Sequence, residues 1–570
     1  MKTKTAVLNG KPDAGNPHVR FDEGEVASAK PRRGSLLYKD RLLACGAALL
    51  AAGVAVAAEA PKGGAAAGDA EAAICAMLAK QTFDLPAIDR ENYGRGSAVP
   101  AGKDYFGWTR DPFESGTAGV KFLGYLPRVS SKDIPSSILS VGLERSNCMG
   151  DALYPALGAA GIKQARVWAE WPAIEKTRGV YDFSALDRRV EALLANGVQP
   201  WFYIGYGNPA VYYPEVKGGN ADWESPYYHG AEAMRAWLAF VAATAEHYRG
   251  KVVRWEVWNE LEARWYHRGK PTQKTLGVEQ SAKDFVDFLR QTAPVIRAAI
   301  PQAKIGVSLC SLSSAWIPAL GDAGAGEVLD AWIYHGYRRT PEELVESAIA
   351  RMRSCVKRPD GQPLELWQGE SGRATGESGR FHMHTEFGQA KFVARRYFKD
   401  AAMGVALSSV FNAADARYGY FKGESKSPKL AYHTLAAMGF LLDGLERAPD
   451  LQMDLTTNGR MSVSPQLPWL AAETHCFRRK GVPLFVWWLP EHPDIETEPL
   501  FGRLILHLGY RDRDNLRHPV VIDPVRRKVW DAADLRWKDA PGTDLIRPIW
   551  ACTYPLIVTD LAVFADCVRP

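Results

Sequence analysis

The segment Lys251-Val-Val-Arg-Trp-Glu-Val-Trp-Asn-Glu260 has the pattern of a buried strand that ends on a carboxylate. A second segment, Leu364-Glu-Leu-Trp-Gln-Gly-Glu370, has the same pattern. In a parallel α/β sheet, ligands meet catalytic side chains at the carboxyl ends of the strands. Two glutamates in that position predict acid/base and nucleophilic chemistry on a sugar.

Strand-like and helix-like segments alternate around these two, from about Ser136 to Ala437. Two of the helical segments, Ser184–Asn196 and Ala282–Ala298, repeat apolar residues at helical spacing, the second around an internal proline. Eight strand–helix units over residues 136–440 predict a (β/α)8 TIM barrel. A doubly wound sheet is the competing architecture, but the first strand is not followed by the glycine pattern of a nucleotide-binding turn. The eight predicted strands are Ile138–Glu144, Gln164–Trp171, Gln199–Tyr206, Val252–Glu260, Lys304–Leu312, Leu329–Tyr337, Leu364–Glu370 and Val405–Phe411.

Residues 441–570 have a different sequence pattern, in which short runs of alternating apolar and polar residues are separated by Gly, Pro and Asp turns. They predict an accessory C-terminal β-sandwich, so that the fold class is α/β with an all-β second domain. In residues 61–135, Pro61–Gly68 predicts a linker, and the part from Tyr105 to Ser131 is expected to add strands to the sandwich. The predicted sandwich runs are Met461–Val463, Trp469–Arg478, Val482–Leu489, Leu504–Leu508, Pro519–Ile522 and Pro555–Ala565.

The N-terminal extension, residues 1–60, contains an unbroken run of apolar and small residues from Leu42 to Ala58. Because the run is short for a membrane span and offers a small-x-small cleavage site at Ala55-Val56-Ala57, it predicts a signal peptide. An uncleaved membrane anchor is the alternative. The expected location is therefore secreted or periplasmic, with no stable membrane span after processing.

The composition excludes several classes of partner. A formal charge of +5 on 570 residues is nearly balanced, so no nucleic-acid partner is expected. The cysteines are widely spaced without a zinc-binding signature, so no metal is expected; Cys552 with Cys567 is one conceivable disulfide. The eighteen tryptophans suit a sugar ligand, because aromatic faces stack on sugar rings, although most of them are expected in the core.

Glu260 and Glu370 are separated by the length that three strand–helix units occupy. Across the rim of an eight-stranded barrel, two such carboxylates can lie about 5–5.5 Å apart, the spacing of a retaining glycosidase. Glu260 is then the general acid/base, kept protonated by partial burial, and Glu370 the ionised nucleophile. The alternative is that both are structural salt-bridge partners at the rim.

With these motifs, the barrel resembles the retaining glycoside hydrolases of clan A, family 39 (β-xylosidase and α-iduronidase types) in the first place and family 5 more distantly. Those enzymes carry an Asn-Glu acid/base motif after the fourth strand and a nucleophilic Glu after the seventh, and Asn259-Glu260 and Glu370 match them. The segment from Ala165-Arg166-Val-Trp168 to Leu186-Asp187 is similar to the second strand–helix unit of family 39. The resemblance covers about 300 residues, the predicted barrel.

The resemblance implies roles for further residues. Arg166 would hold the nucleophile charged, Asn259 would donate to the sugar 2-hydroxyl and Tyr337 would contact Glu370. Strict alternation along the fourth strand would point Asn259 and Glu260 in opposite directions, so a bend or bulge is expected there. The full set of predicted substrate contacts is Asn259, Arg166, His335, Tyr337, Trp168, Tyr206, Asn208 and Trp367, with core packing as the alternative for the aromatic residues.

Together these patterns predict an enzyme: a retaining glycoside hydrolase that cleaves O-glycosidic bonds of oligo- or polysaccharides through a covalent glycosyl-enzyme, without cofactor. A transglycosidase and a non-catalytic carbohydrate-binding protein on the same barrel are the alternatives. The sequence leaves the sugar, the linkage and the oligomeric state open.

Overall fold

The computed structural model describes residues 64–83, 120–144, 149–375, 385–415, 417–422, 426–457, 472–493, 501–509, 516–540 and 543–568. The predicted signal or anchor segment, residues 42–58, lies outside this part of the chain, as does the predicted strand Met461–Val463. In the described part, no helix is long and apolar enough to cross a membrane.

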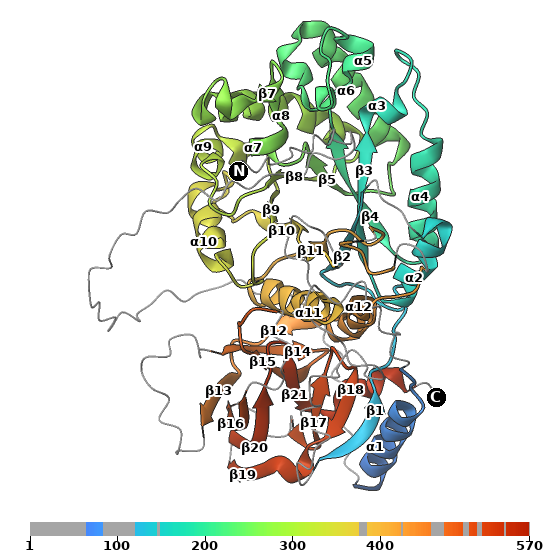
Figure 1. The fold of residues 1–570 in the computed structure, drawn as a ribbon, viewed down its shortest axis with the longest axis vertical. Helices are drawn as coiled ribbons and strands as arrows, with labels where there is room; N and C mark the ends of the chain where they lie inside the picture. Colours follow the sequence, from blue (N-terminus) through green and yellow to red (C-terminus); the bar gives the residue numbers. More distant parts are fainter. Residues whose placement is uncertain are drawn as a thin grey trace, which may run out of the picture. The chain divides into compact units, whose positions relative to one another are not determined.

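Eight parallel strands close into a barrel, which confirms the predicted fold class (Figure 1). Each predicted barrel strand contains one of them, because strands covered on both faces read as hydrophobic runs in the sequence. The circular order is β10-β11-β2-β3-β4-β5-β8-β9. The strands are β2 (Leu139–Leu143), β3 (Gln164–Glu170), β4 (Gln199–Gly205), β5 (Arg254–Val257), β8 (Lys304–Leu309), β9 (Ala331–His335), β10 (Glu365–Glu370) and β11 (Leu407–Val410).

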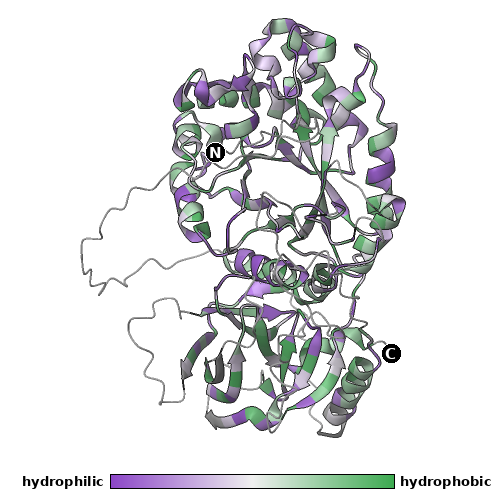
Figure 2. Ribbon diagram, in the orientation of Figure 1, coloured by the Kyte–Doolittle hydropathy of each residue, from purple (hydrophilic) through white to green (hydrophobic). Residues whose placement is uncertain are grey.

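Helices such as α4 (Ser184–Ala195) and α8 (Val278–Ala299) bury one apolar face against the barrel, whereas α11 (Glu386–Ala402) is buried along almost its whole length. In α4, the buried residues Leu186, Val190 and Leu193 recur at helical spacing, and Figure 2 shows hydrophilic residues on the same helix. Helix α8 contains the predicted segment with its internal Pro294. The other helices of this region are α2 (Leu153–Ala159), α3 (Trp171–Ile174), α5 (Pro209–Tyr212), α6 (Gly230–His247), α7 (Leu261–Arg264), α9 (Trp316–Asp322), α10 (Val345–Cys355) and α12 (Leu430–Leu441). A short hairpin of β6 (Tyr266–His267) and β7 (Lys270–Pro271) follows α7.

The C-terminal region forms the predicted β-sandwich from two antiparallel sheets. One sheet has the order β1-β18-β17-β21-β15-β14-β12 and the other β13-β16-β20-β19. The last predicted run is only half strand: β21 ends at Asp560, and a 3-10 helix, Leu561–Cys567, follows because the Asp560 side chain caps it by accepting from the Ala562 amide. The strands are β1 (Lys121–Tyr125), β12 (Leu445–Arg447), β13 (Gln452–Thr457), β14 (Glu473–Arg479), β15 (Val482–Trp488), β16 (Phe501–Gly509), β17 (Pro519–Asp523), β18 (Lys528–Asp531), β19 (Arg536–Ala540), β20 (Thr543–Ala551) and β21 (Leu556–Asp560).

The segment before the barrel differs in part from the prediction. Strand β1 pairs with β18 and so completes the larger sheet, as expected. The predicted linker is wrong from Gly64 onward, because helix α1 (Gly64–Ala79) begins there. Alanine is the strongest helix former, and burial of Ile74 and Leu78 anchors the helix despite its glycines. The suggested disulfide is also wrong, since Cys552 and Cys567 are both free.

Candidate active site

Glu260 and Glu370 both lie at the carboxyl end of the barrel. Strand β5 ends at Val257, and Trp258 and Glu260 then adopt left-handed backbone angles, with φ of 66° and 50°. This turn is the expected departure from strand alternation, and it leads directly into α7. Such angles cost about 1–3 kcal/mol per non-glycine residue and persist only where neighbours hold them. Here the Trp258 indole donates to the Arg264 carbonyl at 2.7 Å, and the Glu260 amide donates to Ser308 Oγ at 2.9 Å.

Arg166, on β3, is the hub of the site and is fully buried. Its Nε and Nη2 donate to the two carboxylate oxygens of Glu256 at 2.8 and 2.9 Å. Its Nη1 donates to Glu144 at 2.9 Å and to Glu370, and Nη2 also reaches Asn259 Oδ1 at 2.9 Å. Burial alone would lower the pKa of Arg166, but Glu256, Glu370 and Glu144 together raise it well above its usual value.

Glu370 ends β10, beside an irregularity in the pairing with β9 between Gln368 and Glu370. Besides Arg166, it accepts a hydrogen bond from the Tyr337 hydroxyl at 3.1 Å. Both contacts are those that the resemblance implied. Gly369 precedes it because a Cβ there would lie 2.6 Å from Ile333 Cγ2 and 3.1 Å from the ring of His335.

Glu260 is bound by a histidine and an arginine. His335 Nδ1 lies 2.9 Å from its Oε1, and Arg264 Nε donates to its Oε2 at 2.8 Å. Burial alone would raise the pKa of Glu260, but the hydrogen bond and charge of His335 and the charge of Arg264 lower it to about 2. The direction of this shift is opposite to the one expected from partial burial alone. The pKa of His335, which burial alone would lower, is raised by Glu370 and Glu260.

The two glutamates converge. One carboxylate oxygen of Glu260, one of Glu370 and a ring nitrogen of His335 all lie within 4.8 Å of one another. His335 Nδ1 lies 3.7 Å from Glu370 Oε2, so the imidazole stands between the two acids. Three such ligand atoms are also a possible set for a metal ion. Arg166 and Arg264 already compensate the two carboxylates, however, and the raised pKa of His335 opposes the neutral form that binds a metal.

Asn259, Tyr206 and Trp168 form a wall beside this centre. Asn259 Nδ2 donates to the Tyr206 hydroxyl at 2.8 Å. The Trp168 ring stacks on Tyr203 with centroids 5.3 Å apart and meets Tyr206 edge-on at 5.5 Å. These three predicted residues are thus brought to the same end of the barrel as the glutamates.

Two further predicted contacts, Trp367 and Asn208, have other partners in the structure. Trp367 is fully buried in a separate core cluster inside the barrel, where it packs against Trp201. Its side chain points to the barrel interior and cannot reach a ligand at the rim. Asn208 is buried at the start of α5, and its amide donates to the backbone oxygen of Glu175 at 2.8 Å. This bond supports the loop, and the substrate contact of Asn208 stays a prediction.

Glu256 and Arg264 belong to the centre and were missing from the predicted site. Glu256 left a signal in the sequence, because it is a carboxylate in the middle of the hydrophobic run Trp255-Glu256-Val257. A charge in a buried strand needs a partner, and Arg166 in another buried strand was the available cation. Arg264 left no such signal, since an arginine in a short segment after a strand is usually solvent-exposed.

Comparison with known proteins places this fold but does not assign a family. No family model matches the chain. The structure is similar to that of a family 39 glycoside hydrolase from Bacteroides cellulosilyticus WH2, with a TM-score of 0.53, 15% identity and coverage of 76% of this chain and 83% of that chain. At this identity the likeness shows a shared fold, and it confirms at that level the resemblance to family 39.

Two further structures have lower scores. A monomeric β-xylosidase from Caulobacter crescentus CB15 gives a TM-score of 0.44 at 14% identity, covering 76% of this chain and 98% of that chain. A family 30 endoxylanase from Clostridium papyrosolvens C71 gives 0.44 at 13% identity, covering 78% of this chain and all of the other.

Proposed function

We propose that this protein is a retaining glycoside hydrolase that cleaves carbohydrate substrates by double displacement, with Glu370 as nucleophile and Glu260 as acid/base. The observation that carries the proposal is the convergence of the two carboxylates, which have oxygens within 4.8 Å of each other at the carboxyl end of the barrel. Retaining enzymes need carboxyl groups about 5–5.5 Å apart, whereas inverting enzymes need about 6.5–9.5 Å to admit a water. The fold shared with a family 39 glycoside hydrolase supports the same reaction.

In the first step, a Glu370 oxygen forms a bond to the anomeric carbon while the glycosidic C–O bond breaks. The leaving oxygen keeps that electron pair and takes a proton from Glu260. In the second step, water attacks the anomeric carbon and gives its proton back to Glu260, and the ester bond electrons return to Glu370. Arg166 and Tyr337, which both donate to Glu370, hold it ionised and oriented before the attack.

The proton for the first step must come from the Glu260–His335 pair. The pKa of Glu260 is lowered and that of His335 is raised, so the pair favours the proton on His335 before the leaving group develops charge. The 2.9 Å hydrogen bond between them lets it pass to Glu260 as the leaving oxygen develops charge. His335 thus holds the proton that Glu260 later donates to the leaving oxygen.

A panel of aryl β-glycosides tests the assignment. The wild-type enzyme hydrolyses at least one of them, and Glu370→Ala abolishes turnover. Added azide restores turnover of Glu370→Ala and gives an α-glycosyl azide. Glu260→Ala slows substrates with poor leaving groups by about 10²–10⁴-fold and substrates with activated leaving groups much less.

Glu365→Gln is the matched control, since this glutamate opens the same strand and bonds to Lys304 and Trp367. It should retain activity. A wild-type protein that binds oligosaccharides but hydrolyses no glycoside would show a carbohydrate-binding protein instead. Transfer of the glycosyl group to sugars in preference to water would show a transglycosidase.

We also propose that the chain is exported, on the strength of the apolar run from Leu42 to Ala58. The mass of the mature N-terminus, measured on protein recovered outside the cytoplasm, tests this. An unprocessed chain held in the membrane would show an anchor.

A further inference from the structure

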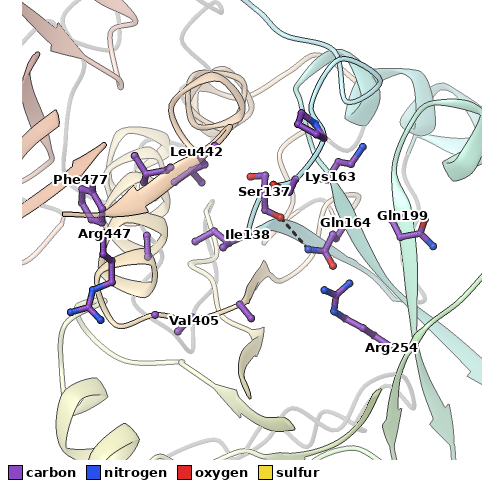
Figure 3. A pocket seen from close by; sticks show the side chains of 17 residues that line it. Ser137, Ile138, Lys163, Gln164, Gln199, Arg254, Val405, Leu442, Arg447 and Phe477 are labelled. Carbon is purple, nitrogen blue, oxygen red and sulfur yellow. Dashed lines mark hydrogen bonds between the residues drawn. The ribbon is translucent and has the colours of Figure 1, made fainter. Parts of the chain in front are cut away.

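A cavity of about 560 Å³ lies at the amino-terminal end of the barrel, the end opposite Glu260 and Glu370. Gln164, Gln199 and Arg254, the first residues of β3, β4 and β5, line one side of it (Figure 3). Strand β12 and Phe477 of β14 line the other. Its volume is in the range of small-molecule sites, about 300–1,000 Å³.

The charged lining of this cavity is entirely basic. Lys163, Arg254 and Arg447 contribute to it, and no Asp or Glu does so among the residues that the structure describes. Burial lowers the pKa of Arg254 and that of Lys163, and two acids behind the lining act against this lowering, Glu365 on Arg254 and Asp443 on Lys163. Both acids are also bound by other groups, Glu365 by Lys304 and Trp367, and Asp443 by Arg479 and Lys480. The cavity therefore has a positive potential that attracts an anion.

Two polar groups at the wall lack partners. Arg254 Nε is buried and makes no hydrogen bond within the described part of the chain. Gln164 is 6% exposed, and its Oε1 is likewise buried and unpaired, while its Nε2 donates to the Ser137 carbonyl at 3.1 Å. Figure 3 shows the polar ends of Gln164 and Arg254 facing the same space. Buried polar groups left without partners cost about 1–3 kcal/mol each, so these two groups together favour a polar ligand in this space.

The two unpaired groups differ in what they need. Arg254 offers donors in a planar fork, which fits a carboxylate or phosphate. Gln164 Oε1 offers an acceptor, which fits a hydroxyl. Ile138, Val405 and Phe477 add apolar surface to the lining, which suits a carbon skeleton.

We infer that this cavity binds a small hydroxylated organic anion, whose carboxylate or phosphate pairs with Arg254 and whose hydroxyl donates to Gln164. The inference is independent of the proposed glycosidase activity, because the site lies at the other end of the barrel. Lys163 supplies long-range attraction: its Nζ already donates to the carbonyls of Ser131 and Gly197 at 3.0 and 3.3 Å.

Isothermal titration of the full chain with gluconate, inorganic phosphate and glucose tests the inference. We expect gluconate to bind, phosphate to compete with it, and uncharged glucose not to displace it. Arg254→Gln should weaken gluconate binding about tenfold or more, and Gln164→Leu should weaken gluconate more than phosphate. Lys251→Gln is the matched control, since it removes a cation three residues from Arg254 that is paired with Glu191 outside the cavity.

Ala406→Phe provides a second test that leaves the charged residues of the cavity unchanged. Ala406 lines the cavity, and a phenyl ring there would fill it. It should abolish gluconate binding without altering aryl-glycoside hydrolysis. Failure of wild type to bind either anion, or equal binding by Arg254→Gln and wild type, would overturn the inference and leave the cavity as a solvent-filled gap. Unchanged binding by a folded Ala406→Phe protein would place the anion elsewhere and overturn it as well.

Discussion

Arg166 is one cation that contacts three carboxylates, and this excess of negative charge affects the protonation of Glu144. Glu256 holds it through two parallel hydrogen bonds, and Glu370 and Glu144 share its Nη1. One guanidinium cannot neutralise three buried charges, so one of the acids must take up a proton. Burial and the charge of Glu370 raise the pKa of Glu144 to about 7, against the opposing effect of Arg166.

We predict that Glu144 makes the protein less stable as the pH rises. The folded-state pKa of about 7 lies above the usual 4.5, so the folded chain binds more protons between these values. The free energy of unfolding should then fall from pH 4.5 to 7 and level off above, by on the order of 3 kcal/mol. Denaturant unfolding at pH 5 and pH 8 should show this fall in the wild type and a much smaller one in Glu144→Gln.

Glu365→Gln serves as the control in the same assay, because Glu365 lies 33% exposed at the far end of the barrel. It should follow the wild-type pH dependence. An equal fall in Glu144→Gln and wild type would assign the effect to other groups, with His335 as the next candidate, since its raised pKa also favours the folded state at low pH.

The sequence predicted the members of this centre better than their protonation states. Glu260 and Glu370 were predictable because each ends a buried strand, and Arg166 because a buried arginine needs a carboxylate. The pKa of Glu260 could not be predicted, because it depends on Arg264 of helix α7 and His335 of strand β9, which come together only in the fold. The spacing of residues in the sequence predicts which face of a helix or strand a side chain is on. It does not predict which side chains from other elements contact that face.

Strand β10 packs closely against β9 at Gly369, where there is no room for a side chain. A methyl group at Gly369 would lie 2.6 Å from Ile333 Cγ2 and 3.1 Å from His335 Nε2. We predict that Gly369→Ala lowers kcat/KM about tenfold or more, because it displaces the imidazole between the two acids, and costs about 1–3 kcal/mol through overpacking. Steady-state kinetics and thermal melting measure both effects.

Ile333→Ala provides the matched background for this test, since it removes the methyl group with the closest contact. In Gly369→Ala/Ile333→Ala the stability loss of the two changes should be less than additive. Strict additivity in a double-mutant cycle would mean that the new methyl group finds room elsewhere and that Gly369 does not position His335.

The strands of the barrel could be predicted because a single cause, burial on both faces, determines their sequence pattern. Parallel strands covered on both faces give continuous apolar runs, which is why all eight strands could be located to within a few residues. Helix α1 could not, because a Gly/Ala-rich segment is helical only when a surface is present to bury its few large side chains. The cavity below the barrel depends on the fit between the two domains and has no counterpart in the sequence.

The barrel and the sandwich are joined through buried charges on α11. Arg395 donates to both oxygens of Glu342 and to the backbone oxygens of Glu491 and Thr553 in the sandwich region. Trp488 of β15 donates to the same Glu342 at 2.8 Å. Burial alone would raise the pKa of Glu342, but Arg395 lowers it to about 2. The two domains therefore share one desolvated ion pair.

We predict that Arg395→Met destabilises the whole molecule by about 3–5 kcal/mol, because it leaves the Glu342 carboxylate buried without its partner. Calorimetry should show one transition at a lower temperature. Arg178→Ala, which breaks an exposed pair with Glu232, is the control and should change stability by less than about 1 kcal/mol. Separate melting of two units in Arg395→Met, with the barrel unchanged, would show that the domains are not coupled through this residue.

Strand β1 pairs with β18, so residues 121–125 lie against residues 528–531 at the edge of one sheet. The barrel is thus inserted between two sequence-distant parts of the sandwich. During synthesis, the first of these strands emerges from the ribosome some four hundred residues before its partner, and until then its backbone groups can pair only with water or with another chain. Nascent chains of this protein should therefore depend on holding chaperones until translation is almost finished, even though the barrel can already close.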